Sequence, residues 1–280
     1  MSKIQFDVVV GNPPYSKRED GQKSSTHIWQ YIVAEAFKHA KDGAYILMVH
    51  PSGWRNINGK FEDTKKLLLS NQMDYLEIHD MKDGMKTFGV STRYDFYVIR
   101  KQPYNGKTTI KCQDGKVVVK NLLDYPHIPN TAFDEVSSLF AKDDEESVQV
   151  YNSSYYSDKR VSLVSEGKHI YPVAINLSVK GCPSMVKWAE HKTLDHYRKK
   201  VILTRLGEAA MLDSEGDYGM SGSCFAIIDE PDNLENIYKA VRNKDFVRFM
   251  KSINVGGQMG NIYEAKLMAL LRKDFWKDYI

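Results

Sequence analysis

The chain has 280 residues, 42% hydrophobic and 27% charged, and a net charge of +3. This predicts a globular protein of one large or two modest domains, and it permits a nucleic-acid partner without requiring one. No apolar run approaches the roughly 18 residues of a membrane span and no signal-peptide pattern is present, so we expect a cytoplasmic protein. The three scattered cysteines indicate neither a disulfide framework nor a zinc site.

The first predicted strand, Phe6–Val10, is apolar on both faces, and after one glycine it is followed by the turn Asn12-Pro13-Pro14-Tyr15. A turn of this kind at the end of a strand can hold an amino group that belongs to a flat π system. The Asn12 side-chain oxygen and the Pro13 carbonyl would accept its two hydrogens and localise the nitrogen lone pair. That prepares a weak nucleophile to attack an electrophilic methyl group, while Tyr15 supplies a stacking face.

The double proline makes this turn rigid. Each ring fixes its own φ, and Pro14 also keeps Pro13 out of the helical region, so the acceptors are positioned before a substrate arrives. The alternative is an ordinary strand-ending turn with an exposed tyrosine, since such residues are common in loops. The hydrophobic strand directly before the turn favours the catalytic interpretation.

Helices and strands are expected to alternate along the next segments, which predicts an α/β fold. We expect a helix over 27–37, a strand with its loop over 43–54, and strands over 74–80 and 94–100. A turn near 102–107 would end the first domain, and a hairpin about Asp114-Gly115 would follow within 108–119. Residues 201–205 are expected to form a buried strand that emerges into a loop.

In its first hundred or so residues the chain resembles the amino-methyltransferases that use S-adenosylmethionine, and more closely the TaqI-like and type IIG adenine-N6 DNA methyltransferases. The resemblance rests on the Asn-Pro-Pro-Tyr turn and on the order of the elements after it. It implies a Rossmann-like methyltransferase fold, duplex DNA as substrate and rotation of an adenine out of the base stack. Phe88, just before the last of these strands, occupies the place of the family's aromatic residue that faces the flipped base.

By this resemblance Asn12, Pro13 and Tyr15 are the expected catalytic residues, and the adenine would lie between Tyr15 and Phe88. Asn12 and Pro14 are expected to touch the cofactor, S-adenosylmethionine, and no metal is required. The family holds the methionine end of its cofactor with a Gly-rich turn after the first strand of its sheet. No such turn precedes Phe6 here, and the glycines of 254–260 are expected to form a DNA-facing or structural loop instead.

We therefore expect residues 1–105 to be a methyltransferase half-domain, a partial sheet without its cofactor-binding half. An apolar strand at the open edge of such a sheet invites pairing with another chain. A split enzyme, whose partner chain brings the cofactor-binding half, is the favoured interpretation. A homo-oligomer, a fragment and a degenerate relative that closes the edge differently remain alternatives.

Residues 106–280 are expected to form a mixed α/β target-recognition domain that binds DNA. Lysine and arginine would neutralise phosphates, and arginine, asparagine and serine could read base edges. Arg205 is the strongest candidate because it follows the predicted buried strand, and the run Arg198-Lys199-Lys200 just before that strand offers further candidate contacts with DNA. The residues singled out for DNA binding are Lys17, Arg18, Trp54, Lys159, Arg160, Arg205 and Ser223. Each could instead be an ordinary surface charge or turn residue.

The expected function is therefore a site-specific, adenine-N6 DNA methyltransferase of restriction-modification or phage type, or one subunit of such an enzyme. Three alternatives stay open. A protein-glutamine methyltransferase uses a similar turn on an amide, and a cytosine-N4 or RNA methyltransferase shares the chemistry. The third is a non-catalytic DNA-binding or decoy subunit that keeps the fold.

Overall fold

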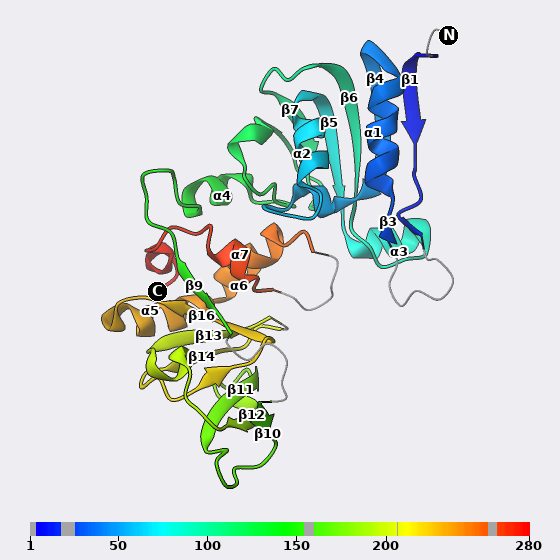
Figure 1. The fold of residues 1–280 in the computed structure, drawn as a ribbon. Coiled ribbons are helices and arrows are strands. Elements are labelled where there is room, and N and C mark those ends of the chain that lie inside the picture. The colour runs from blue at the N-terminus through cyan, green and yellow to red at the C-terminus, as the bar shows by residue number, and fades with distance from the viewer. Residues whose placement is uncertain (1–3, 18–25, 154–159, 206, 257–261) are drawn as a thin grey trace. The chain divides into compact units, whose positions relative to one another are not determined.

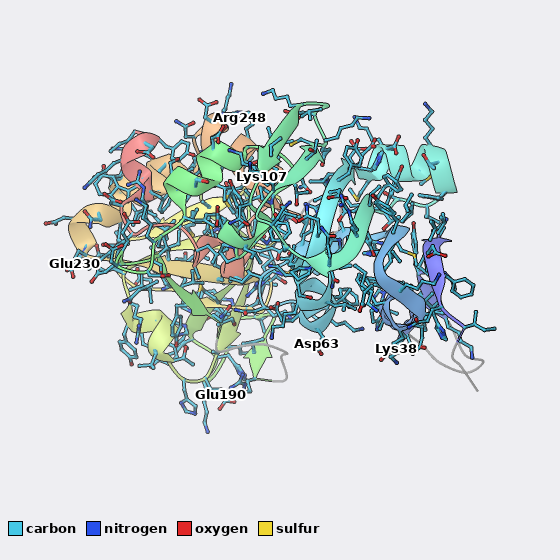
Figure 2. All side chains as sticks on the ribbon, turned by 90° about the horizontal axis from the view of Figure 1, so that it is seen from above. Lys38, Asp63, Lys107, Glu190, Glu230 and Arg248 are labelled. Carbon is cyan, nitrogen blue, oxygen red and sulfur yellow. The ribbon has the colours of Figure 1, made fainter. Side chains whose placement is uncertain are left out.

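The protein is described by a computed structural model over residues 4–17, 26–153, 160–205, 207–256 and 262–280. It divides into two compact units. The first comprises Met1–Thr131 and Val255–Gly257, and the second comprises Ala132–Asn254 and Gln258–Ile280. Charged side chains lie on the surface of both units, as Figure 2 illustrates with Lys38, Asp63, Lys107, Glu190, Glu230 and Arg248.

A six-stranded mixed sheet forms the centre of the first unit. Its strands are β1 (Phe6–Gly11), β4 (Ala40–Pro51), β5 (Asn71–His79), β6 (Tyr94–Pro103), β7 (Thr108–Lys111) and β8 (Val117–Lys120). They lie in the order β1-β4-β6-β5-β7-β8 (Figure 1). β1 is parallel to β4 and β5 is parallel to β7, whereas β6 is antiparallel to both of its neighbours. The short strands β2 (Ser16–Lys17) and β3 (Thr26–His27) pair separately.

Two helices cover one face of this sheet. α1 (Trp29–His39) packs on β4, α2 (Glu62–Leu69) packs on β5, and the helices contact each other (Figure 1). The buried side chains of α1 recur at helical spacing, Trp29, Val33, Ala36 and Phe37, so one stripe of the helix faces the strands. The remaining helical segments are α3 (Met81–Phe88), η1 (Ser52–Arg55) and η2 (Leu122–Asp124). The predicted α/β class and the order of its early elements are confirmed.

β1 is an edge strand, as expected for the strand before the turn. The side chains of Phe6, Val8 and Val10 are 48%, 54% and 72% exposed. These three residues alternate along the strand and therefore share one face of it. The opposite edge strand, β8, also exposes Val117 and Val119. The first unit thus ends in two edges with exposed apolar side chains.

The first unit extends beyond the boundary expected near residue 105. The predicted hairpin is present as β7 and β8 around Asp114-Gly115, where Gly115 has a φ of +84° and Lys116 N–H donates to Asp114. However, β7 pairs with β5 and so becomes part of the sheet. The units divide after Thr131 because this hydrogen bonding ties the hairpin to the first unit.

The second unit contains two four-stranded sheets that share a core. One has the order β14-β13-β16-β9 and comprises β9 (Gln149–Asn152), β13 (Lys200–Thr204), β14 (Ala210–Asp213) and β16 (Cys224–Ile228). The other has the order β10-β12-β11-β15 and comprises β10 (Val161–Ser162), β11 (Tyr171–Leu177), β12 (Pro183–Ala189) and β15 (Gly219–Met220). Ala174, Ile202, Met220 and Ala226 belong to one apolar cluster that joins the two sheets.

Helices complete the second unit: α4 (Phe133–Leu139), α5 (Pro231–Val241), α6 (Lys244–Ile253), α7 (Ala265–Met268), η3 (Leu194–Tyr197) and η4 (Phe275–Asp278). α5 packs on β13 and β14. Every residue of β13 is buried, which confirms the strand predicted at 201–205 and leaves Arg205 at its end. Among the described residues, no helix is long and apolar enough to cross a membrane.

Candidate functional site

The turn Asn12–Tyr15 leaves the end of β1 at a point where the backbone passes close to β4. A Cβ on Gly11 would lie 2.9 Å from the sulfur of Met48, so glycine permits this approach. Asn12 and Pro14 are exposed, Pro13 is buried and Tyr15 is half-buried. The Tyr15 carbonyl accepts a hydrogen bond from Ile28 N–H at 3.3 Å, which ties the turn to the start of α1.

The two expected acceptors of the turn are not used by the protein itself. Within the described part of the chain, no hydrogen bond engages the Asn12 side chain or the Pro13 carbonyl. An acceptor that already holds a protein donor would have to release it before binding a substrate amine. Here both remain available at the end of the strand.

The structure brings Tyr15 and Phe88 together, although they lie far apart in the sequence. Their ring centroids are 6.2 Å apart with an interplanar angle of 75°, an edge-to-face contact. Phe88 occupies the last turn of α3, which ends at Gly89 in the left-handed conformation with a φ of +71°. A perpendicular ring leaves no parallel gap for a planar base, so a base between these rings would have to displace Phe88.

A second layer of aromatic side chains supports Phe88, and the sequence did not predict it. The Tyr94 ring meets Phe88 edge to face at 4.9 Å and stacks on the His79 ring at 4.3 Å. Asp83 accepts from the Tyr94 hydroxyl and pairs with His79 Nδ1 at 3.0 Å. Tyr94 and His79 are direct partners in the β5–β6 register. Only that register could have identified them, and it is not readable from either strand alone.

The same unit contains a buried ion pair between Arg55 and Asp95. Asp95 is fully buried, and its Oδ2 accepts from Trp54 Nε1 at 2.8 Å and from Arg55 Nε at 2.9 Å. Arg55 also donates to the carbonyls of Ile128 and Pro129 and to Asn130 Oδ1. These bonds join η1 to the loop after η2. Trp54 is 0% exposed, so the prediction that it contacts DNA is wrong: it packs inside and supports Asp95.

The protonation state of Tyr15 follows from its surroundings. Burial, with a smaller contribution from the nearby negative charge of Asp95, raises the pKa of Tyr15 to about 12. Its hydroxyl oxygen is buried and has no hydrogen-bond partner in the described part of the chain. Tyr15 is therefore neutral at physiological pH, which suits a stacking surface and not a general base.

His50, on β4, has a structural role. His50 is fully buried, stacks on Trp29 at 4.1 Å and lies 3.1 Å from the Tyr97 hydroxyl through Nε2. Burial lowers its pKa to about 4, against a smaller raising effect of the Pro51 carbonyl. A neutral imidazole thus fills the layer between α1 and the sheet.

Comparison with known proteins connects this geometry to a family. Residues 1–88 match the family described as Eco57I restriction-modification methylase. This N-terminal segment is therefore similar to restriction-modification methylases. The match contains both the Asn12–Tyr15 turn and Phe88, and the resemblance to TaqI-like methyltransferases is confirmed.

Two curated relatives of this chain are viral. Modification methylase CviBIII of Paramecium bursaria Chlorella virus NC1A is 23% identical over 261 residues, which cover 86% of this chain and 64% of the relative. Type II methyltransferase M.CvrRI of Paramecium bursaria Chlorella virus XZ-6E is 28% identical over 125 residues, 41% of this chain and 32% of the relative. The chain thus spans less than two thirds of the length of either relative.

The fold of the chain also matches a solved structure, that of the Type IIL restriction-modification enzyme MmeI in complex with DNA. The TM-score is 0.55, and the match covers 94% of this chain and 46% of the other. Because only 8% of the residues are identical, this match establishes the fold alone. It extends over both compact units.

The predicted DNA-binding residues have different outcomes. Lys17 and Arg160 are exposed, whereas Arg18 and Lys159 lie outside the described residues. Arg205 and Ser223 are brought together, since Arg205 N–H donates to the Ser223 carbonyl at 2.8 Å. Their contact with DNA remains a prediction.

One member of the basic run 198–200, Lys200 at the start of β13, is not available to DNA. Lys200 is 0% exposed, and its Nζ lies 2.5 Å from Asp213 Oδ2. Asp213 in turn accepts from the backbone N–H groups of Asp217 and Tyr218. The prediction of Lys200 as a DNA contact is therefore wrong, because the side chain alternates inward with the strand. Arg198 does lie over the Tyr151 ring at 4.9 Å.

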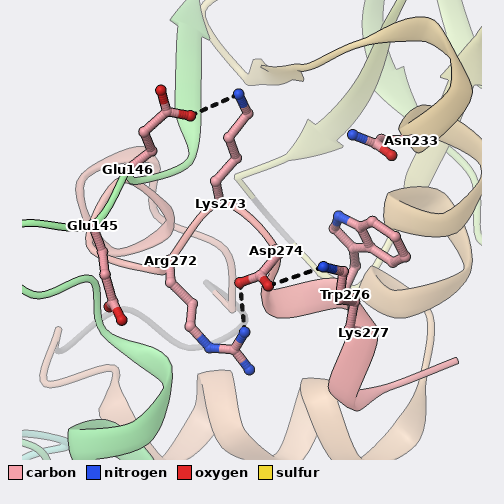
Figure 3. A pocket seen from close by; sticks show the side chains of 8 residues that line it. All are labelled: Glu145, Glu146, Asn233, Arg272, Lys273, Asp274, Trp276 and Lys277. Atoms are coloured by element: carbon pink, nitrogen blue, oxygen red, sulfur yellow. Dashed lines mark hydrogen bonds and ion pairs between the residues drawn. The ribbon is translucent and has the colours of Figure 1, made fainter.

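A pocket of about 470 Å³ belongs to the second unit and shares no residue with the Asn12 turn (Figure 3). Its charged side chains are largely paired with one another. Lys273 pairs with Glu146 at 2.8 Å, and Asp274 binds Arg272 at 2.5 Å and Lys277 at 3.2 Å (Figure 3). Glu145, Asn233 and Trp276 complete the lining.

Proposed function

We propose that this chain is the catalytic and target-recognition part of an adenine-N6 DNA methyltransferase that uses S-adenosylmethionine. One observation carries the proposal: Asn12 and Pro13 offer acceptors that the described residues do not engage, directly beside the Tyr15–Phe88 contact. The match of residues 1–88 to restriction-modification methylases supports DNA as the substrate.

The chemistry follows from what the turn can bind. An exocyclic amine is a weak nucleophile because its lone pair is delocalised into the base. Asn12 Oδ1 and the Pro13 carbonyl would each accept one N–H, which draws the nitrogen toward a tetrahedral geometry and localises that lone pair. The double proline fixes both acceptors in advance, so little ordering is needed when the base arrives. S-adenosylmethionine, when bound, supplies the electrophilic methyl group.

The base would be held by the aromatic residues. Neutral Tyr15 offers one face for stacking, and Phe88 would move from its edge-to-face position to cover the other. Tyr94 and His79 lie behind Phe88 and would limit how far it can move. An adenine captured in this way must first leave the duplex, which costs a few kcal/mol of unstacking.

The described residues fit the cofactor only in part. Asn12 and Pro14 are exposed at the end of β1 and would contact it. Within the described first unit, no strand is followed by the Gly-rich turn and helix that would hold the methionine end. We propose that a cofactor-binding half pairs with the exposed edge of β1. A second protein chain is the preferred source of that half, and a homo-oligomer is the alternative.

The second unit would supply the DNA contacts. Arg160, Arg205 and Ser223, together with Lys17 of the first unit, are the described candidates. Basic side chains above aromatic rings, such as Arg198 over Tyr151, keep their charge near the surface in a defined orientation. Such groups suit a nucleic-acid surface, where positive charge supplies affinity and oriented donors supply specificity.

Product analysis tests the proposal. The chain, purified from its host with any bound partner, is incubated with duplex DNA and S-adenosylmethionine carrying a labelled methyl group. The expected product, after digestion to nucleosides and mass spectrometry, is N6-methyladenine. N4-methylcytosine, labelled RNA or labelled protein would replace the substrate assignment, and no transfer with any partner would favour the non-catalytic alternative.

A further inference from the structure

Arg205, at the end of β13, is held in one orientation by three contacts. Its guanidinium lies over the ring of the buried Phe225 at 5.3 Å. Nε donates to the Gly222 carbonyl at 3.1 Å, and Nη2 donates to Asn152 Oδ1 at 2.8 Å. Such fixation holds the planar guanidinium ready for recognition of two acceptors, which a base edge or a phosphate can provide.

The contact with Arg205 also fixes the orientation of the Asn152 amide. A guanidinium has only N–H donors, so the atom that faces it must be the oxygen of Asn152. Asn152 is an exposed residue at the end of β9, and its NH2 group therefore points away from Arg205. The donors that the pair can offer to a ligand are the Asn152 NH2 group and the N–H groups of Arg205 that do not take part in its contacts with Gly222 and Asn152.

A row of donors selects among the bases by simple complementarity. In the major groove guanine presents two acceptors, O6 and N7, whereas adenine presents one acceptor and one donor. The adenine amino group would meet another donor, and cytosine offers a donor as well. Among the bases, only guanine presents two neighbouring acceptors that match two adjacent N–H donors.

We propose that the Arg205–Asn152 pair recognises a guanine in the DNA target sequence. This inference rests on the proposed function, since it takes duplex DNA as the ligand, but it does not depend on which base is methylated. Ser223 is exposed next to the pair, where its carbonyl accepts from Arg205 N–H and helps to fix the end of β13. The pair would set one base of the recognition sequence.

The experiment selects binding sites from a randomised duplex pool with the chain purified from its host with any bound partner. Wild-type protein is expected to enrich sites with one invariant G·C pair. Arg205→Lys keeps the charge and loses the planar fork, so preference for guanine at that position should fall roughly tenfold or more. Asn152→Ala should weaken the same preference less, because the guanidinium remains. The dependence of affinity on salt should stay unchanged for both variants.

Arg248→Lys is the matched control. Arg248, labelled in Figure 2, is an exposed arginine on α6 of the same unit. It pairs with Glu135 and Asp245. This variant should leave the selected sequence unchanged. Thermal melting of each variant shows whether the second unit remains folded.

Two results would overturn the inference. If Arg205→Lys weakens binding to all sequences equally, or if the selected sites contain no invariant G·C pair, the pair does not select guanine, while DNA binding and the proposed function still stand. If wild-type protein binds no duplex DNA, the proposed function fails together with the inference.

Discussion

The Asn12 turn and the Arg205–Asn152 pair differ in whether their hydrogen-bonding groups already bind other groups of the protein. The turn keeps the Asn12 and Pro13 acceptors unengaged by the described residues, and proline rings hold them in place. In the second unit, Arg205 and Asn152 engage each other and are oriented by that contact. A backbone-fixed turn can leave its acceptors open, whereas long, flexible side chains need mutual contacts to become specific.

The largest expected effect comes from Asn12→Ala. Removing one preorganised partner of a reacting group typically costs about 10²- to 10³-fold in rate. We expect methyl transfer by the assembled enzyme to fall by at least that factor, while affinity for DNA stays within about twofold of wild type. Asn105→Ala, at an exposed turn of the same unit, is the control. If Asn12→Ala lowers the affinity for DNA as strongly as it lowers methyl transfer, the distinction between the catalytic turn and the DNA-binding pair does not hold.

The buried His50 should make the stability of the first unit pH-dependent. Its folded pKa of about 4 lies below the ordinary value of 6.5, so the unfolded state binds the proton first as the pH falls. The contribution of neutral His50 to the free energy of unfolding is complete above pH 6.5. It is lost as the pH falls toward 4, by about 3 kcal/mol in total.

Urea unfolding of wild type and of His50→Gln at pH 7.5 and 4.5 measures this contribution. The wild type should lose more stability than the variant over this interval. Equal losses would show that His50 titrates normally and that it is not sealed between α1 and the sheet.

Tyr15→Ala should weaken the capture of a flipped base by about 1–3 kcal/mol, since one stacking face is lost. Tyr15→Phe keeps the ring and removes a hydroxyl that is buried without a partner in the described part of the chain, so capture should be unchanged. Fluorescence of 2-aminopurine at the target position reports base flipping. If Tyr15→Phe weakens base capture as much as Tyr15→Ala does, the hydroxyl contributes to capture and the ring is not merely a stacking surface.

The smallest expected effect concerns the proposed partner. Val10→Lys places a charge on the exposed face of β1, and we expect assembly to weaken at least tenfold, equivalent to about 1.4 kcal/mol. Val119→Lys makes the same change on β8, the other edge strand, and should have no effect. Native mass spectrometry of both variants measures the assembly. Equal assembly in both would exclude β1 as the docking edge.

Several features followed from local sequence alone. The Asn12–Tyr15 turn, the hairpin at Asp114-Gly115 and the buried strand before Arg205 all lie where the sequence predicts them. Turn residues act through their own φ preferences, and a fully apolar run must be buried wherever the chain places it. The place of Phe88 was implied by resemblance to a family, and its contact with Tyr15 agrees with that placement.

Other features were decided only by tertiary structure. Trp54 and Lys200 are polar-tipped residues that suggested surface contacts, but Asp95 and Asp213 provide buried partners for them. The stacking of Tyr94 on His79 depends on strand register. The Arg205–Asn152 contact depends on the folding of β9 against β16. Each of these contacts joins residues from separate segments of the chain, and the conformational preferences of a single segment do not determine such contacts.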